Sequence, residues 1–116
     1  MMNEAVNSFL MAVKEQGQLQ PLLESADLRL TLITEEQTIQ LVFKNGVASA
    51  TYGTEIEPTM YSICGDADDI TRLLRGSERL RTLQKGGFLK VSAPLRMALL
   101  LESIFYLAKP DRALVS

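Results

Sequence analysis

The spacing of apolar residues in the first part of the chain predicts a single amphipathic helix. Val6, Phe9, Leu10 and Val13 recur at intervals of three and four residues, which places their side chains on one face of an α-helix. Gly17 follows a few residues later and is suited to the end of that helix. The next segment, "QPLLESA", predicts a short turn of helix because proline is tolerated at the first helical position.

From residue 28 the apolar period shortens to two, the repeat of a strand that buries one face. The segments "LRLTLIT" and "TIQLVFK" both show this alternation. Asn45 and Gly46 follow the second segment, and both tolerate the positive φ angles of a tight hairpin turn. The chain therefore returns as a third strand, and another strand follows Pro58. Strands are expected at 28–34, 38–44, 47–53 and 59–65.

The second half of the chain returns to the helical period. Asp66 is a candidate N-cap, and Pro94 is suited to open the last helix. Helices are expected at 66–76, 77–87 and 94–110, with a fifth strand at 88–93. This order of elements is typical of an α+β domain. We interpret residues 1–116 as one domain whose five-stranded, mostly antiparallel sheet is covered by helices.

The last helical segment, "PLRMALLLESIFYLAKP", is more apolar than packing on one sheet face requires. At about 100° per residue its apolar side chains span roughly 180°, whereas a stripe of about 100° suffices to face a core. Leu95 and Leu99 intrude, one turn apart, into the remaining polar sector. Three interpretations are open: the helix fills a groove beside the 77–87 helix, it roofs an apolar cavity that holds a ligand, or Leu95 and Leu99 form a homodimer contact.

The chain contains no histidine and a single cysteine, Cys64. This composition excludes a histidine-dependent catalytic site, a disulfide framework and the common zinc sites. Cys64 lies in an alternating strand and is expected to be a small, inert core residue. The three acids within 66–69 are typical of the first turn of a helix, and Glu35 and Glu36 are typical of a solvated turn. We therefore expect no catalytic residue, no bound metal and no cofactor.

Charge is distributed unevenly along the sequence. Residues 1–71 hold three basic and eleven acidic residues, a net charge of −8, whereas residues 72–96 hold seven basic and one acidic residue, a net charge of +6. Nucleic acid is disfavoured as a partner because the chain as a whole carries −2 and the basic segment has no interleaved aromatic residues. No signal peptide or membrane span is recognisable, so the cytoplasm is the expected location. The candidates for contact with an anionic head group or a transient anionic membrane surface are Arg75, Arg79, Lys85 and Lys90.

Three motifs, taken in order, resemble the sterol carrier (lipid-transfer) domain family. They are "VFKNG", "ICGDADDITRLLRG" and "LQKGGFLKVSAPLRMALLL", and the resemblance covers about residues 28–108. The chain departs from the family at Ser92-Ala93-Pro94, where a glycine followed by an aspartate or asparagine is usual. This departure alters the start of the last helix and bears on the shape of a cavity mouth, while leaving the fold expectation intact.

The resemblance implies an apolar cavity between the sheet and the C-terminal helix. Members of the family bind fatty acids, acyl-CoA esters, phospholipids or sterols without covalent chemistry, and others serve as accessory or oligomerisation domains. The resulting hypothesis is a non-catalytic carrier for an apolar or amphipathic small molecule. The alternative is a structural domain that pairs with a second copy or a partner through its C-terminal helix. The implied cavity-lining residues are Leu80, Leu83, Phe88, Met97, Leu101, Ile104 and Phe105.

Overall fold

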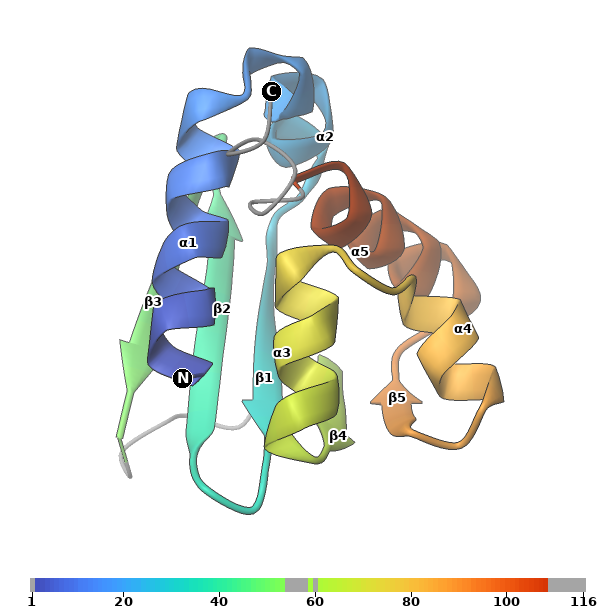
Figure 1. Ribbon diagram of the computed structural model, residues 1–116. Coiled ribbons are helices and arrows are strands. Elements are labelled where there is room, and N and C mark those ends of the chain that lie inside the picture. The colour runs from blue at the N-terminus through green and yellow to red at the C-terminus, as the bar shows by residue number, and fades with distance from the viewer. Residues whose placement is uncertain (1, 54–58, 60, 109–116) are drawn as a thin grey trace.

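The computed structural model describes residues 2–53, 59 and 61–108 (Figure 1). It confirms the α+β fold and the five-stranded sheet expected from the sequence. The elements are α1 (Met2–Glu15), the 3-10 helix η1 (Gly17–Leu19), α2 (Gln20–Ser25), β1 (Leu28–Ile33), β2 (Thr38–Lys44), β3 (Val47–Tyr52), β4 (Tyr61–Gly65), α3 (Ala67–Arg75), α4 (Leu80–Lys85), β5 (Leu89–Ser92) and α5 (Leu95–Ala108).

The strands lie in the order β3-β2-β1-β4-β5, so the first strand of the sequence is the central one. β1 pairs antiparallel with β2, β2 with β3, and β4 with β5. The pairing of β1 with β4 is parallel, with Leu32 opposite Ile63. The sheet is therefore mostly antiparallel, as predicted, and the parallel pair joins its two antiparallel parts.

One face of the sheet is apolar and the other is polar. Leu30, Leu32, Leu41 and Ile63 are fully buried and share the inward face. Cys64 follows Ile63 along β4, so it points to the opposite face, where it is exposed. The expectation that Cys64 is a core residue is therefore wrong. Ile63 occupies the inward position because successive side chains in a strand alternate between faces.

The helices cover the inward face of the sheet. α1 and α3 pack side by side over the strands, and α5 crosses at one end of the helical layer (Figure 1). The centre of the core is a trio of phenylalanines from three elements: the ring centroid of Phe9 on α1 lies 6.5 Å from that of Phe43 on β2 and 5.0 Å from that of Phe105 on α5. These contacts connect both ends of the described chain through one buried cluster.

Local backbone signals in the sequence agree with the structure at the β2–β3 turn. Asn45 and Gly46 adopt φ angles of 55° and 77°, which the hairpin prediction requires. The start of α3 differs in one respect. Asp66 occupies the N-cap position, but the carboxylate of Glu35 accepts a hydrogen bond of 2.9 Å from the backbone N–H of Ala67. Glu35, predicted to be a solvated turn residue, thus fastens the β1–β2 turn to α3.

Candidate functional site

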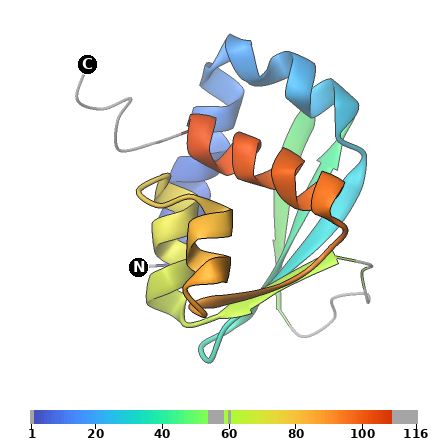
Figure 2. The ribbon, with the colours of Figure 1, turned by 90° about the vertical axis from the view of Figure 1, so that its right-hand side faces the viewer.

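α5 packs mainly on other helices, contacting α4, α3, α1, α2 and η1 (Figure 2). At about 100° per residue, its buried positions cover only about 120° of the helix. The apolar surplus expected from the sequence is therefore present, but much of it faces outward. The buried residues of α5 are Ala98, Leu101, Ile104, Phe105 and Ala108.

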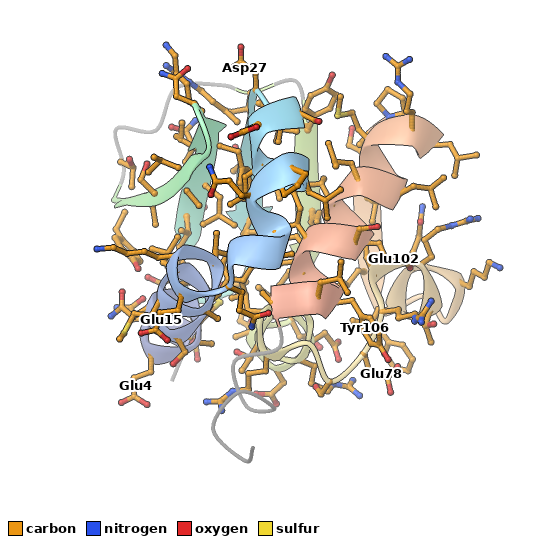
Figure 3. The ribbon with its side chains drawn as sticks, turned by 90° about the horizontal axis from the view of Figure 1, so that it is seen from above. Glu4, Glu15, Asp27, Glu78, Glu102 and Tyr106 are labelled. Carbon is orange, nitrogen blue, oxygen red and sulfur yellow. The ribbon has the colours of Figure 1, made fainter. Side chains whose placement is uncertain are left out.

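Polar contacts fasten the C-terminal half of α5 to the α4 segment. The carboxylate of Glu102 accepts a hydrogen bond of 2.9 Å from the backbone N–H of Arg81, in the first turn of α4, where backbone donors lack helical partners. The guanidinium of Arg79 lies 4.3 Å from the ring centroid of Tyr106, a cation–π distance. Figure 3 shows Glu102 and Tyr106 on the side of α5 that faces α4.

The same half of the helix is fastened on its other side to α1. The Phe105 ring is fully buried against Phe9. Past the end of α1, the side-chain amide of Gln16 donates a hydrogen bond to the backbone carbonyl of Ala108. This bond satisfies one of the carbonyl groups that a helix leaves unpaired at its C-terminus. Residues 102–108 are thus held from two sides.

The N-terminal half of α5 is more exposed. Leu95 and Leu99 are 59% and 42% exposed, and Met97 and Leu100 are half-buried against the core. On the sheet, Tyr61 on β4 and Val91 on β5 are also half-buried and share the inward face with Leu30 and Ile63, their partners in the neighbouring strands. We name these four half-buried residues the α5 seam: Tyr61, Val91, Met97 and Leu100. The seam residues are partly exposed and also pack against the buried core.

The predicted cavity-lining residues occupy two kinds of position. Phe88 lies apart from the others: it is 54% exposed, and its ring lies 5.7 Å from the guanidinium carbon of Arg72. Met97 belongs to the α5 seam. The remaining five are fully or almost fully buried in the same core cluster: Leu80, Leu83, Leu101, Ile104 and Phe105. Their role as a cavity lining stays a prediction.

The four predicted head-group residues do not form one cluster. Arg79 precedes α4 and contacts the Tyr106 ring of α5, whereas Lys85 is the last residue of α4. Arg75, at the end of α3, lines a pocket of about 290 Å³ that also contains Glu4, from α1. Lys90 lies opposite Cys64 in the β4–β5 pair, so it points to the polar face of the sheet. Of the four, the structure therefore shows a contact with α5 for Arg79, and Lys85 lies on the neighbouring α4.

Two further pockets were not predicted from the sequence. One of about 410 Å³ lies between α1 and the β2–β3 hairpin, with Leu10, Lys14, Gln20 and Val47 in its lining. Another of about 400 Å³ is lined by residues of β1, β2 and the start of β4. Each combines distant segments, so no local motif marks either one. The predicted lining residues do not contribute to these pockets.

Comparison with known proteins gives no family model and no curated protein that matches the sequence. Solved structures do match. A protein described as "UbiJ-SCP2 Ubiquinone synthesis protein" superposes with a TM-score of 0.74 at 14% identity, covering 92% of this chain and 94% of that chain. The sterol carrier protein domain 2 of Helicoverpa armigera superposes with a TM-score of 0.73 at 14% identity, covering 91% of this chain and 86% of that one. The chain has the sterol carrier fold.

The sterol carrier fold also occurs inside a larger enzyme. The sec-alkylsulfatase Pisa1 from Pseudomonas sp. matches with a TM-score of 0.60 at 19% identity, over 74% of this chain but only 13% of that protein. The resemblance indicated by the three sequence motifs is thus confirmed at the level of the fold. Within this sterol carrier fold, α5 and the strands below it form the candidate site.

Proposed function

We propose that this chain is a non-catalytic carrier for an apolar or amphipathic small molecule of the fatty acid, acyl-CoA, phospholipid or sterol class. The ligand would enter through the α5 seam and place its apolar part beneath the N-terminal half of α5. The observation that carries this proposal is the uneven attachment of that helix. Its C-terminal half is fixed by Glu102, Phe105 and Ala108, whereas Met97 and Leu100 remain half-buried.

The chemistry of the seam suits an apolar tail. Met97 is unbranched and adapts to irregular partners, and Leu100, Val91 and the Tyr61 ring offer a largely apolar surround. A tail that covers these side chains gains about 25 cal/mol for each Å² of apolar surface removed from water. Small-molecule sites are commonly built this way, with an apolar lining and few polar groups to set orientation.

The polar end of an amphipathic ligand would remain near the surface. Of the four predicted head-group residues, Arg79 contacts α5 and Lys85 lies on the neighbouring α4, whereas Arg75 and Lys90 belong to other surfaces. We therefore restrict the head-group role to Arg79 and Lys85. Carriage without chemistry needs only these cations and the seam, since neither bond making nor bond breaking is involved.

The proposal is tested by ligand binding in solution, without membranes. Native mass spectrometry of the purified protein should show a co-purifying lipid mass, and a fluorescent fatty acid should bind and be displaced by unlabelled fatty acid. Met97→Trp, which fills the seam, should weaken this binding at least tenfold. Leu107→Trp is the matched control, because Leu107 lies on the same helix but is 46% exposed and outside the seam. A folded protein that binds none of the four lipid classes would disprove the carrier proposal.

A further inference from the structure

The outward face of α5 carries exposed leucines without any acidic residue among them. Leu95, Leu99 and Leu107 are 59%, 42% and 46% exposed. The helix has 14 residues and is about 21 Å long. Its one acidic residue, Glu102, faces α4 because it accepts the hydrogen bond from Arg81. We name Leu95, Leu99 and Leu107 the leucine face.

Exposed cations lie on α5 and on the neighbouring α4 segment. Arg96 is exposed on α5 itself, and Arg79 and Lys85 are exposed on the neighbouring α4 segment. Figures 2 and 3 show α4 and α5 together along one side of the molecule. Residues 78–108 hold five basic residues and two acidic ones, Glu78 and Glu102, whereas residues 1–71 are strongly acidic. The exposed leucines therefore belong to a basic segment of an acidic protein.

We infer that the leucine face docks on an anionic lipid membrane, with α5 parallel to the surface. Helices that lie in a membrane interface combine exposed apolar side chains with flanking cations, and their binding strengthens with anionic lipid. Insertion across the bilayer is a different case: among the described residues, no helix has the length and apolarity that a span requires. The leucines would enter the head-group region while Arg79, Lys85 and Arg96 contact lipid phosphates.

A second copy of this chain fits the leucine face less well. In a two-fold symmetric contact, each residue near the axis meets its own counterpart. A contact centred on Leu99 would bring Arg96, Arg79 and Lys85 of one copy toward the same cations of the other. Like charges that face each other oppose association. The charge of this surface thus favours an anionic partner, which a lipid bilayer supplies.

This inference deepens the proposed carrier function and depends on it for its purpose. Met97 and Leu100 belong to the seam and lie on the same half of α5 as Leu95 and Leu99. Docking through the leucine face would therefore bring the seam to the membrane, where a lipid could pass between bilayer and protein. The contact itself, however, can be measured separately from ligand binding.

The experiment measures co-sedimentation of the full chain with vesicles of phosphatidylcholine that contain phosphatidylglycerol, and with vesicles of phosphatidylcholine alone. We expect binding to the anionic vesicles and much weaker binding to the neutral ones. Leu95→Glu combined with Leu99→Glu should lower the partition coefficient at least tenfold. Lys85→Gln and Arg96→Gln should each lower the partition coefficient about fivefold. This factor corresponds to about 1 kcal/mol of binding free energy for each basic residue near the membrane surface.

Matched controls come from the opposite part of the fold. Val47→Glu changes a side chain that is 64% exposed on β3, the strand at the far edge of the sheet from β5. Lys14→Gln removes a cation from α1. Both controls should bind anionic vesicles like the unchanged protein. All of the substituted positions are exposed, so every variant should remain folded. Circular dichroism checks this expectation.

The outcomes separate docking from carriage. If the Leu95→Glu, Leu99→Glu variant loses vesicle binding but still binds the fluorescent fatty acid, the docking inference is supported. If vesicle binding persists in that variant, or falls equally in the Val47→Glu control, the inference is overturned. It is also overturned if sedimentation velocity shows a dimer that the leucine changes dissociate. Failure of the fatty acid to bind, with vesicle docking intact, would reject the carrier proposal alone.

Discussion

The C-terminal half of α5 is held by several contacts and the N-terminal half is more exposed. This difference predicts that replacing a side chain by alanine lowers the free energy of unfolding much more in the C-terminal half. Phe105→Ala removes a ring that is 0% exposed and lies 5.0 Å from the Phe9 ring. Truncation of a buried phenylalanine costs about 3–5 kcal/mol, because transfer free energy is lost and a cavity remains. Met97→Ala removes a half-buried side chain that water already reaches, so we expect about 1 kcal/mol.

Urea unfolding followed by circular dichroism measures both variants against the unchanged protein. The slope m should remain constant, so that the difference in free energy follows from the shift in midpoint. At about 4 °C for each kcal/mol in a domain of this size, Phe105→Ala should also lower the melting temperature by roughly 12–20 °C. Both substitutions introduce alanine, the residue of highest helix propensity, and the gain is larger for Phe105→Ala, so propensity works against the expected difference rather than producing it.

Similar losses of unfolding free energy for Phe105→Ala and Met97→Ala would contradict the division of α5 into a fixed C-terminal half and an open N-terminal half. Equal losses above about 3 kcal/mol would mean that the N-terminal half of α5 is as tightly packed as the rest. A loss below about 1.5 kcal/mol for Phe105→Ala would mean that its ring faces space that the protein does not fill. Either result would remove the basis for the seam as the point where a ligand enters.

Two further changes test other parts of the structure. Gly46→Ala should destabilise the protein by about 1 kcal/mol, because Gly46 has a φ of 77°, which alanine adopts only with strain. The added Cβ would also lie 2.3 Å from the side-chain nitrogen of Gln20, but that side chain is flexible and can move away. Adding Gln20→Ala, which relieves only that contact, should restore little stability in urea unfolding. Cys64 is exposed, so a thiol reagent should modify it in the folded protein as fast as in urea; slow reaction that urea accelerates would place it in the core.

The parts of the fold that depend on neighbouring residues could be predicted from the sequence. The Asn45-Gly46 turn, the strands on either side of it and the helices after Asp66 follow from local propensity and spacing. The parallel pairing of β1 with β4 could not, because no local pattern records which distant strands meet. The order of the strands therefore needed the structure, even though the number of strands did not.

The candidate site shows the same limit more clearly. The helical wheel of α5 revealed excess apolar surface, but burial of a given leucine depends on α4 and α2, which lie elsewhere in the sequence. Cys64 shows the limit within a strand: Ile63 and Cys64 are both apolar, and pairing with Leu32 places Ile63 inward. Glu35, which binds the N–H of Ala67, carried no sequence signal because its partner is 32 residues away.

The position of α5 after the other described elements affects the order in which their packing is completed during synthesis. Chains emerge from the ribosome with the N-terminus first, so α1 exists before the strands that it covers. The helix that closes the other end of the core is made last. Before α5 is synthesised, Leu80 and Leu83 of α4 lack the helix that packs against α4 in the folded domain. Their apolar side chains are then more exposed to water than in the complete fold. The packing of α4 is thus completed only after α5, the last of the described elements, has been synthesised.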